Sequence, residues 1–493
     1  MVNKIDYKIG IIGGGFGGLG IAIRLKKENR DSFVVFERAE EVGGTWRDNT
    51  YPGCACDIPS HLYSYSFEMN PNWSRTYSKQ PEILAYIIAC KKKYALEAHI
   101  RYNTTITEAV FQEKEGYWKL TDQAGKVTLV EHVVSAIGPL NVPNIPQFKG
   151  SESFEGTSFH SSEWKDSIDL KNKRVAVIGT GASAVQIVPN IVSEVKQLSL
   201  FQRSASWILP KDDFEISGVS KTIFRRFPFV QKLRRTGLYW FYEYVGGALF
   251  SDNLTRTITR RMAKRHLEKQ VPDKVLRKKL SPNYEIGCKR RLPSDEFYPA
   301  LMQANADVVS DAIQEITPKG IVDAQGILHE VDVIIYATGF HVADFSRRNL
   351  SFIGRGGVNL FENWAAKVPK AYYGTLVSGF PRLFFILGPN TGLGHNSQLH
   401  VMESQFNYII DYLNESDKLP AGYLDVKPAA QKKFNEAIHK KLKGMVWSSG
   451  GCNSWYLNDS GHNSTLWPGY TATYRRKTQK IVRKDFDVLE GGA

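Results

Sequence analysis

The chain has 493 residues, 42% of them hydrophobic, and a formal net charge of +14. This length exceeds what one ordinary hydrophobic core supports, so we expect two or three domains. The composition, with 41 glycines, excludes a fibrous or disordered protein and favours a globular α/β protein. No run of eighteen apolar residues occurs, and the N-terminus enters a strand pattern without a signal-peptide core, so we expect a cytoplasmic protein.

The first elements expected in the chain are a strand at residues 7–12, a glycine-rich turn and a helix. The turn reads Gly13-x-Gly15-x-x-Gly18, and glycines at this spacing permit a tight turn and bring backbone N–H groups close to a pyrophosphate. The following strand ends at Glu37, where a carboxylate suits the hydroxyls of an adenosine ribose. This unit therefore predicts a dinucleotide site.

The same pattern recurs later in the chain, where a strand leads into Gly179-x-Gly181-x-x-Ala and a helix. Glu37 follows Gly13 by 24 residues, and Arg203 follows Gly179 by the same interval. An arginine at this position suits a 2′-phosphate, whereas a carboxylate suits a free ribose diol. We therefore predict FAD at the first site and NADPH at the second, with hydride transfer between them. The alternative is that each glycine cluster is only a tight turn, but the occurrence of two motifs at matched spacing argues against it.

Between Arg203 and the pair Lys289-Arg290 lies a strongly basic segment. Residues 211–290 contain 19 Lys and Arg against eight Asp and Glu, so they supply +11 of the net charge. A charge confined to one segment predicts no nucleic-acid partner. Its helix-like stretches favour a helical subdomain with its own core, packed over the NADPH domain with its arginines facing solvent. Contact with anionic lipid is the alternative.

Two further buried strands, within residues 131–146 and 329–340, each run into a loop where we expect the chain to pass between dinucleotide domains. The predicted fold is α/β, with two Rossmann-like dinucleotide-binding domains and a helical insertion in the second. The expected boundaries are 1–145 and 346–493 for the FAD-binding domain, 146–210 and 291–345 for the NADPH-binding domain, and 211–290 for the insertion.

The stretch "GGTWRDNTYPGCACD" at residues 43–57 resembles a signature of the Baeyer-Villiger monooxygenases, a family within the class B flavoprotein monooxygenases. The positions that match this signature are Gly43, Gly44, Trp46, Tyr51, Pro52, Gly53 and Asp57. A second family signature is matched by Phe154, Gly156, His160 and Trp164, while Lys165 stands where the family has proline or aspartate. The resemblance covers essentially the whole chain.

The resemblance implies that NADPH reduces FAD, that dioxygen forms a C4a-peroxyflavin, and that a ketone is converted to an ester or lactone. It implies Arg290 as the catalytic cation, because a guanidinium stays charged when desolvated. Asp57 is the partner expected to orient Arg290 and offset its charge. Sulfides are expected as further substrates, and a monomer or weak homodimer is expected.

The motifs and the resemblance together give one set of expected cofactor-binding residues and no metal site. These residues are Gly13, Gly15, Gly18, Glu37, Gly44, Thr45, Trp46, Asp57, Gly179, Gly181, Ser183, Arg203, Ser204, Lys289, Asn390 and Trp455. Asn390 lies in a turn before a helix expected to begin near Asn396, whose positive N-terminal dipole would face the flavin. His395 in the same turn is either a flavin contact or a helix cap.

Three alternatives remain open from the sequence. A flavin-containing monooxygenase acting on amines or sulfides would carry an asparagine in the segment where this chain has Asp57. A disulfide reductase needs a redox-active cysteine pair, but one residue between Cys54 and Cys56 leaves too little room for an unstrained bridge. The third alternative is a flavoprotein without catalytic activity that serves only in binding or sensing. We expect all five cysteines to be reduced, with Cys54 and Cys56 as small apolar fillers beside the flavin.

Overall fold

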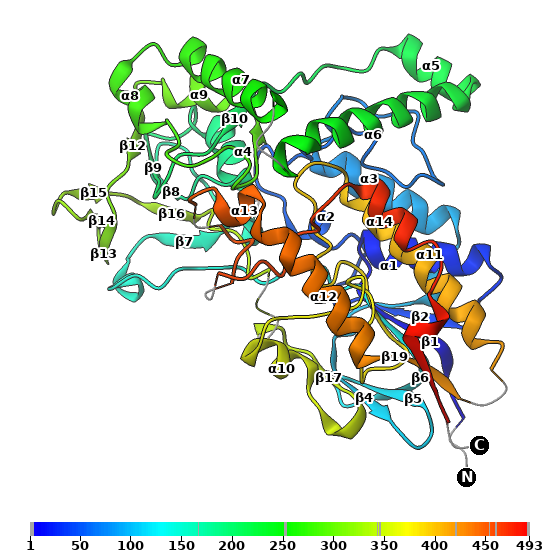
Figure 1. The fold of residues 1–493 in the computed structure, drawn as a ribbon. Helices are drawn as coiled ribbons and strands as arrows, with labels where there is room; N and C mark the ends of the chain where they lie inside the picture. Colours follow the sequence, from blue (N-terminus) through cyan, green and yellow to red (C-terminus); the bar gives the residue numbers. More distant parts are fainter. Residues whose placement is uncertain are drawn as a thin grey trace.

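The computed structural model describes residues 4–165, 167–250, 254–342, 344, 347–419, 422–452, 454–458 and 461–490. Within these residues the chain builds two main β-sheets, one at each end of the molecule, with helices packed around and between them (Figure 1). The α/β prediction with two Rossmann-like units is confirmed.

The first sheet has eight strands in the order β17-β4-β5-β6-β1-β2-β3, with β18 beside β6. Among the described strands of this sheet, only β5 runs against its neighbours, and the other pairs are parallel. The strands are β1 (Tyr7–Ile12), β2 (Phe33–Phe36), β3 (Ile100–Arg101), β4 (Ile106–Gln112), β5 (Tyr117–Asp122), β6 (Val127–Ser135), β17 (Ser351–Ile353) and β18 (Leu383–Phe385).

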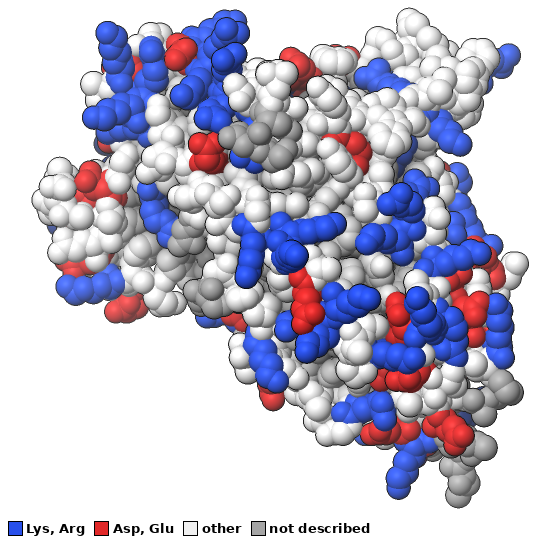
Figure 2. All heavy atoms as spheres, in the orientation of Figure 1, with Lys and Arg blue, Asp and Glu red and all other residues white. Residues whose placement is uncertain are grey.

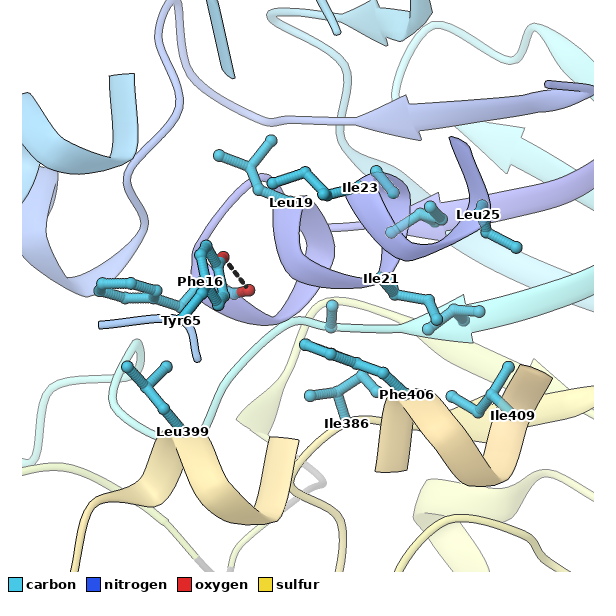
Figure 3. Close-up of a cluster of buried hydrophobic side chains, with 14 of the residues drawn as sticks. Phe16, Leu19, Ile21, Ile23, Leu25, Tyr65, Ile386, Leu399, Phe406 and Ile409 are labelled. Atoms are coloured by element: carbon cyan, nitrogen blue, oxygen red, sulfur yellow. Dashed lines mark hydrogen bonds between the residues drawn. The ribbon is translucent and has the colours of Figure 1, made fainter. Parts of the chain in front are cut away.

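Helix α1 (Phe16–Lys27) follows the first glycine motif and packs against α11 (Gln398–Ser416), which lies far away in the sequence (Figure 3). A Cβ atom at Gly20 would lie 2.4 Å from the ring of Phe406, so the two helices approach closely only because residue 20 has no side chain. The Tyr65 hydroxyl donates a 2.6 Å hydrogen bond to the carbonyl of Phe16. This packing fixes the N-terminus of α1.

The second sheet has five parallel strands in the order β12-β9-β8-β16-β7. They are β7 (Thr157–His160), β8 (Arg174–Ile178), β9 (Gln197–Phe201), β12 (Ala306–Val309) and β16 (Val333–Tyr336), and α4 (Ala182–Ile191) follows β8. The smaller sheets are formed by β10 (Ile208–Leu209) with β11 (Leu292–Pro293), by β13 (Ile313–Thr317), β14 (Gly320–Asp323) and β15 (Leu328–Glu330), and by β19 (Tyr423–Val426) with β20 (Phe486–Leu489).

The two main sheets share a local arrangement around their first glycine. Strand β6 pairs with β1, and β16 pairs with β8 in the same way. A Cβ atom at Gly13 would lie 2.6 Å from the carbonyl oxygen of Ala136, and one at Gly179 would lie 2.4 Å from that of Ala337. Both glycines also have positive φ angles, so any other residue would be strained and would clash with the neighbouring strand.

The loops after β6 and β16 lie against each other. The N–H of Asn144 donates to the carbonyl of Gly339 at 2.9 Å, and the Thr338 hydroxyl donates to the carbonyl of Asn144. The buried ring of His160 also contacts the Gly339 carbonyl, at 2.9 Å from Nε2. The two segments that join the sheets are therefore held together, with His160 of the second signature at their crossing point.

The remaining helices cover both sheets and the region between them. They are α2 (Thr45–Asp48), α3 (Gln80–Lys93), α5 (Gly218–Arg226), α6 (Pro228–Phe250), α7 (Leu254–Gln270), α8 (Lys274–Lys279), α9 (Phe297–Leu301), α10 (Leu360–Ala366), α12 (Pro428–Lys443), α13 (Val446–Ser449) and α14 (Thr471–Lys477), with short 3₁₀ turns at Glu97–His99, Ser151–Ser153, Ser161–Glu163, Arg355–Gly357 and Arg483–Asp485. Among the described helices, none combines the length and apolar character needed to cross a membrane.

The helices of the basic segment differ from the expected independent subdomain. Helix α7 lies by the second sheet, but α6 crosses to the first unit (Figure 1). Arg235 of α6 is buried and donates to the carbonyl of His61 at 2.8 Å, and the hydroxyls of Tyr242 and Tyr77 lie 3.3 Å apart. The prediction of a helical subdomain with its own core is therefore wrong for α6, because the inner side of this helix, including Arg235, packs against the first unit.

Glu243 of α6 connects the helical segment to the C-terminal part of the chain. Its buried carboxylate accepts from the Thr471 hydroxyl and backbone N–H at the start of α14, and from the side chain of Asn396 at 2.8 Å. The Nε2 atom of His395 lies 3.2 Å away. Burial alone raises the pKa of Glu243, but His395 and Thr471 outweigh it and lower the pKa to about 2.

We expect Glu243→Gln to lower the free energy of unfolding by about 3 kcal/mol, because the change removes one charge from a buried, hydrogen-bonded pair. Since the folded pKa of Glu243 is below its ordinary value of 4.5, its stabilisation is complete above about pH 4.5 and is lost as the pH falls towards 2. Denaturant unfolding at a series of pH values measures both effects. An equal difference between wild type and variant at every pH would contradict the assignment.

Candidate active site

The first glycine motif forms an open cradle at the N-terminus of α1. Among the described residues, no side chain caps the helix at Gly15, so the N–H groups of its first turn are available to an anionic ligand. The N–H of Gly43 donates to the carbonyl of Gly14 at 3.0 Å. Gly44 has φ +53°, and a Cβ atom there would lie 3.2 Å from the Cα of Gly15. The stretch that contains Gly44, Thr45 and Trp46 therefore lies directly against this cradle.

Glu37 closes the other side of the same cradle, as its position after β2 predicts. Its buried carboxylate accepts from the N–H of Gly14 at 2.7 Å and from Arg47 Nη1 at 2.7 Å. Arg47 was not among the residues expected at this site, although it lies within the 43–57 stretch. The arrangement leaves a carboxylate beside the glycine turn, which is the group that a ribose diol requires.

The second glycine turn has the same strand–turn–helix backbone as the first, but basic side chains lie beside it in place of a carboxylate. In the described part of the chain, no side chain caps α4 at Gly181, and a Cβ atom there would meet nothing within 4 Å. Ser183 lies in the first turn of this helix. Lys289 Nζ donates to Ser204 Oγ at 2.6 Å, and burial together with the charge of Arg203 lowers the pKa of Lys289. These groups fit a phosphate.

Arg203 itself is exposed at the end of β9. Within the described residues, neither Arg203 nor Lys289 has a carboxylate partner within 4 Å. Two neighbouring cations without a counter-charge favour a dianion such as the 2′-phosphate of NADPH.

Asp57 and Arg290 meet as the sequence analysis expected. Arg290 Nε donates to Asp57 Oδ2 and Nη2 donates to Oδ1, each at 2.7 Å. Burial alone raises the pKa of Asp57, but Arg290 outweighs it and holds the pKa below its ordinary value. Asp57 in turn raises the pKa of Arg290. Both groups therefore stay charged, and this two-point contact fixes the plane of the guanidinium.

Aromatic and basic residues that the sequence analysis missed surround this pair. Tyr456 is buried beside it, and burial raises its pKa. Tyr63 accepts a 3.0 Å hydrogen bond from Trp46 Nε1, which orients the tryptophan of the signature. Burial lowers the pKa of Arg291 to about 10. Arg291 could have been found from the sequence, because it continues the basic run at 289–291. Tyr63 and Tyr456 lie in no motif that would have indicated a place at this site.

The stretch 43–57 spans both nucleotide units. The Tyr51 hydroxyl donates to Gln186 Oε1 at 3.1 Å, and Gln186 Nε2 donates to the carbonyl of Ala55 at 2.9 Å. Gly53 has φ +81°, and a Cβ atom there would lie 2.6 Å from the carbonyl oxygen of Gln186. The signature therefore runs from the first cradle, across α4 of the second unit, to Asp57.

One part of the cysteine prediction is wrong, because Cys288 and Cys452 form a disulfide. The partners are 164 residues apart and show no recognisable spacing. The bond joins the Arg290 segment to the loop that carries Trp455. Cys54 and Cys56 remain free thiols and are buried in two different cores. Burial raises the pKa of Cys54 to about 12, which does not suit a reactive thiolate.

The three candidate residues from the C-terminal part of the chain, Trp455, Asn390 and His395, differ in burial and in their contacts. Trp455 is 48% exposed and its ring centroid lies 4.3 Å from that of Tyr456. Asn390 is buried with φ +57° and donates from Nδ2 to the carbonyl of Asn463 at 2.9 Å. His395 does not cap α11, because that helix begins at Gln398 with Ser397 before it and His395 faces Glu243. The helix therefore starts two residues later than expected.

Two dinucleotide cradles, joined by a stretch that ends in a carboxylate-held arginine, define a flavoprotein that uses a second dinucleotide. The family description "Flavin-binding monooxygenase-like" matches residues 6–363. The chain is 49% identical to a Baeyer-Villiger monooxygenase of Pseudomonas aeruginosa, over 96% of this chain and 90% of that protein. It is 43% identical to a Baeyer-Villiger monooxygenase of Streptomyces coelicolor, over 98% and 92% respectively.

Solved structures agree with these relatives. A closed crystal structure of cyclohexanone monooxygenase superposes with a TM-score of 0.88 at 25% identity, covering 99% of this chain and 100% of the other. An oxidised steroid monooxygenase bound to NADP gives a TM-score of 0.87 at 28% identity with the same coverage. The chain belongs to the flavin-binding monooxygenases and, within them, to the Baeyer-Villiger group. It is an FAD- and NADPH-dependent monooxygenase.

Proposed function

We propose that Arg290, held by Asp57, is the catalytic cation with which this monooxygenase inserts one oxygen atom of dioxygen next to a ketone carbonyl. The observation that carries the proposal is the orientation of the guanidinium. Asp57 occupies Nε and one hydrogen of Nη2, which leaves Nη1 and the second Nη2 hydrogen as donors. The Arg290 side chain is 32% exposed, so part of it is open to a ligand.

The bound cofactors supply the redox chemistry, since NADPH donates a hydride and FAD, once reduced, activates dioxygen. The residues of this chain position and polarise the reactants. Arg290 donates to the substrate oxygen as negative charge develops on it, and its fixed charge stabilises that oxyanion more than the neutral carbonyl. Asp57 keeps the guanidinium in one plane, so little reorganisation is needed during the reaction.

The cofactor residues follow from the two cradles. The FAD contacts in this proposal are Gly13, Gly15, Gly18, Glu37, Gly44, Thr45, Trp46, Asp57 and Asn390, and the NADPH contacts are Gly179, Gly181, Ser183, Arg203, Ser204, Lys289 and Trp455. The open helix N-termini and the unpaired cations described above support this assignment. We also propose the domain boundaries expected from the sequence. In this division Lys289 would reach the NADPH from the 211–290 insertion, and Trp455 would reach it from the C-terminal part of the FAD-binding domain.

Product analysis tests the function directly. Purified enzyme with NADPH is incubated with linear, cyclic and aryl ketones, and with sulfides and amines, and the products are separated by gas chromatography. We expect esters or lactones from at least one ketone class, with sulfoxides as further products. Oxygenation of amines and sulfides without conversion of any ketone would instead support a flavin-containing N- or S-monooxygenase.

Asp57→Asn tests the proposed positioning of Arg290. The amide keeps one acceptor oxygen but removes the negative charge and one of the two hydrogen bonds. We expect kcat/KM for the ketone to fall about 10–100-fold and more of the consumed NADPH to yield hydrogen peroxide. FAD content and the thermal midpoint serve as controls for folding. An unchanged ratio of ester formed to NADPH consumed would rule out this role.

We further propose a cytoplasmic monomer or weak homodimer. Sedimentation velocity over a range of protein concentrations measures the oligomeric state. Thiol labelling of freshly lysed cells, with and without reductant, measures how much of the Cys288–Cys452 bond forms in the cell. A stable higher oligomer would contradict the first expectation, and a fully oxidised pair in every molecule would argue against a reducing compartment.

A further inference from the structure

The outer side of α5 and α6 exposes large apolar side chains. Val219, Ile223, Phe229, Leu233, Trp240 and Tyr244, here called the α5–α6 face, are each between 38% and 71% exposed. At roughly 100° per residue, the four of them on α6 lie within about 60° of one another. They therefore form one stripe along a helix of 23 residues.

The inner side of the same helices packs against residues of the first unit. Phe224 is buried and its ring lies 4.9 Å from that of His61. Gln231 donates to the carbonyl of Asn70 at 2.6 Å, and Arg235 donates to the carbonyl of His61. The orientation of α6 is thus fixed by polar contacts on one side, and the opposite side presents its apolar stripe to solvent.

The charge around this stripe has one sign. Residues 217–244, which span the face, contain six basic residues and one acidic residue, Glu243, which is buried and lies beside His395. Lys221, Arg225, Arg226, Lys232 and Arg234 have no carboxylate partner within 4 Å among the described residues. In the space-filling view the lobe around α5 shows white apolar or neutral side chains together with blue Lys and Arg (Figure 2).

We propose that the α5–α6 face docks this enzyme on an anionic lipid surface. Aromatic and aliphatic side chains along one helix face, flanked by lysines and arginines, fit the boundary between lipid headgroups and acyl chains. Each basic residue near such a surface adds to the attraction. A second copy of the chain is a poor occupant, because a symmetric contact through this face would place like charges opposite each other.

Flotation of the FAD-loaded enzyme with lipid vesicles tests this proposal. The vesicles contain either phosphatidylcholine alone or equimolar phosphatidylcholine and phosphatidylglycerol. The charge variant is Arg225→Gln, Arg226→Gln and Lys232→Gln. The apolar variant is Phe229→Ser, Leu233→Ser and Trp240→Ser. The matched control is Lys432→Gln, Lys433→Gln and Lys440→Gln, which removes three exposed lysines from α12.

We expect the wild type and the α12 control to float with anionic vesicles only, and high salt to release them. Both face variants should bind at least about tenfold more weakly, with ketone oxidation in solution unchanged. Absence of wild-type flotation, or equal flotation of wild type and both face variants, would overturn the proposal. So would a wild-type dimer that the apolar variant converts to a monomer, because the face would then bind a second copy.

Discussion

Replacing Arg290 with alanine should reduce ester formation about 10²–10³-fold, because the change removes the cation that we propose to stabilise the developing oxyanion. The bidentate contact with Asp57 ends with it, and the carboxylate is left without its partner. NADPH oxidation should continue, with its electrons going to hydrogen peroxide. Parallel measurements of NADPH consumption, peroxide and ester in the same reaction give the result.

Arg290→Lys is the matched control for this experiment. A lysine keeps the positive charge but lacks the planar fork that matches a carboxylate at two points. Its ester yield should therefore lie between those of wild type and Arg290→Ala. Equal loss of ester formation and flavin reduction in both variants, at full FAD content, would count against the catalytic role, because Arg290 would then be needed before the oxygen-transfer step.

Arg203→Ala should lower kcat/KM for NADPH about 10–100-fold and leave kcat/KM for NADH nearly unchanged, because the contact that we propose for Arg203 is to the 2′-phosphate that only NADPH carries. The residue is exposed, lies two residues after the end of β9, and is close to Lys289. Steady-state rates with both nucleotides measure the change in preference.

Lys196→Ala is the control, since Lys196 is an exposed cation at the opposite end of the same strand. It should change neither rate. If Arg203→Ala lowers kcat/KM equally for NADPH and NADH, Arg203 does not bind the 2′-phosphate.

The main architecture could be predicted because its signals are local. Each glycine motif lies between a strand and a helix within about 30 residues, and the equal spacing to Glu37 and Arg203 distinguished the two cradles. The pairing of Asp57 with Arg290 was expected only through the family resemblance. No spacing rule connects residues 233 positions apart, so the contact needed the fold or a known relative.

The features that the sequence did not reveal are long-range or depend on helix orientation. The Cys288–Cys452 bond and the Glu243–His395 pair join distant segments whose separation has no pattern. The composition of α6 indicated a helix, but not which side would find a partner. Arg235 faces the first unit, while Trp240, five residues later, faces solvent.

The central claim is that one atom of dioxygen enters a ketone through the Arg290 site. The most direct measurement uses isotopically labelled dioxygen, NADPH and a ketone, with mass spectrometry of the product from the wild type and from Arg290→Ala. We predict an ester or lactone carrying one labelled oxygen atom from the wild type, and its near-complete loss in the variant with NADPH still consumed. Unlabelled ester, or labelled ester at wild-type yield from the variant, would contradict the account.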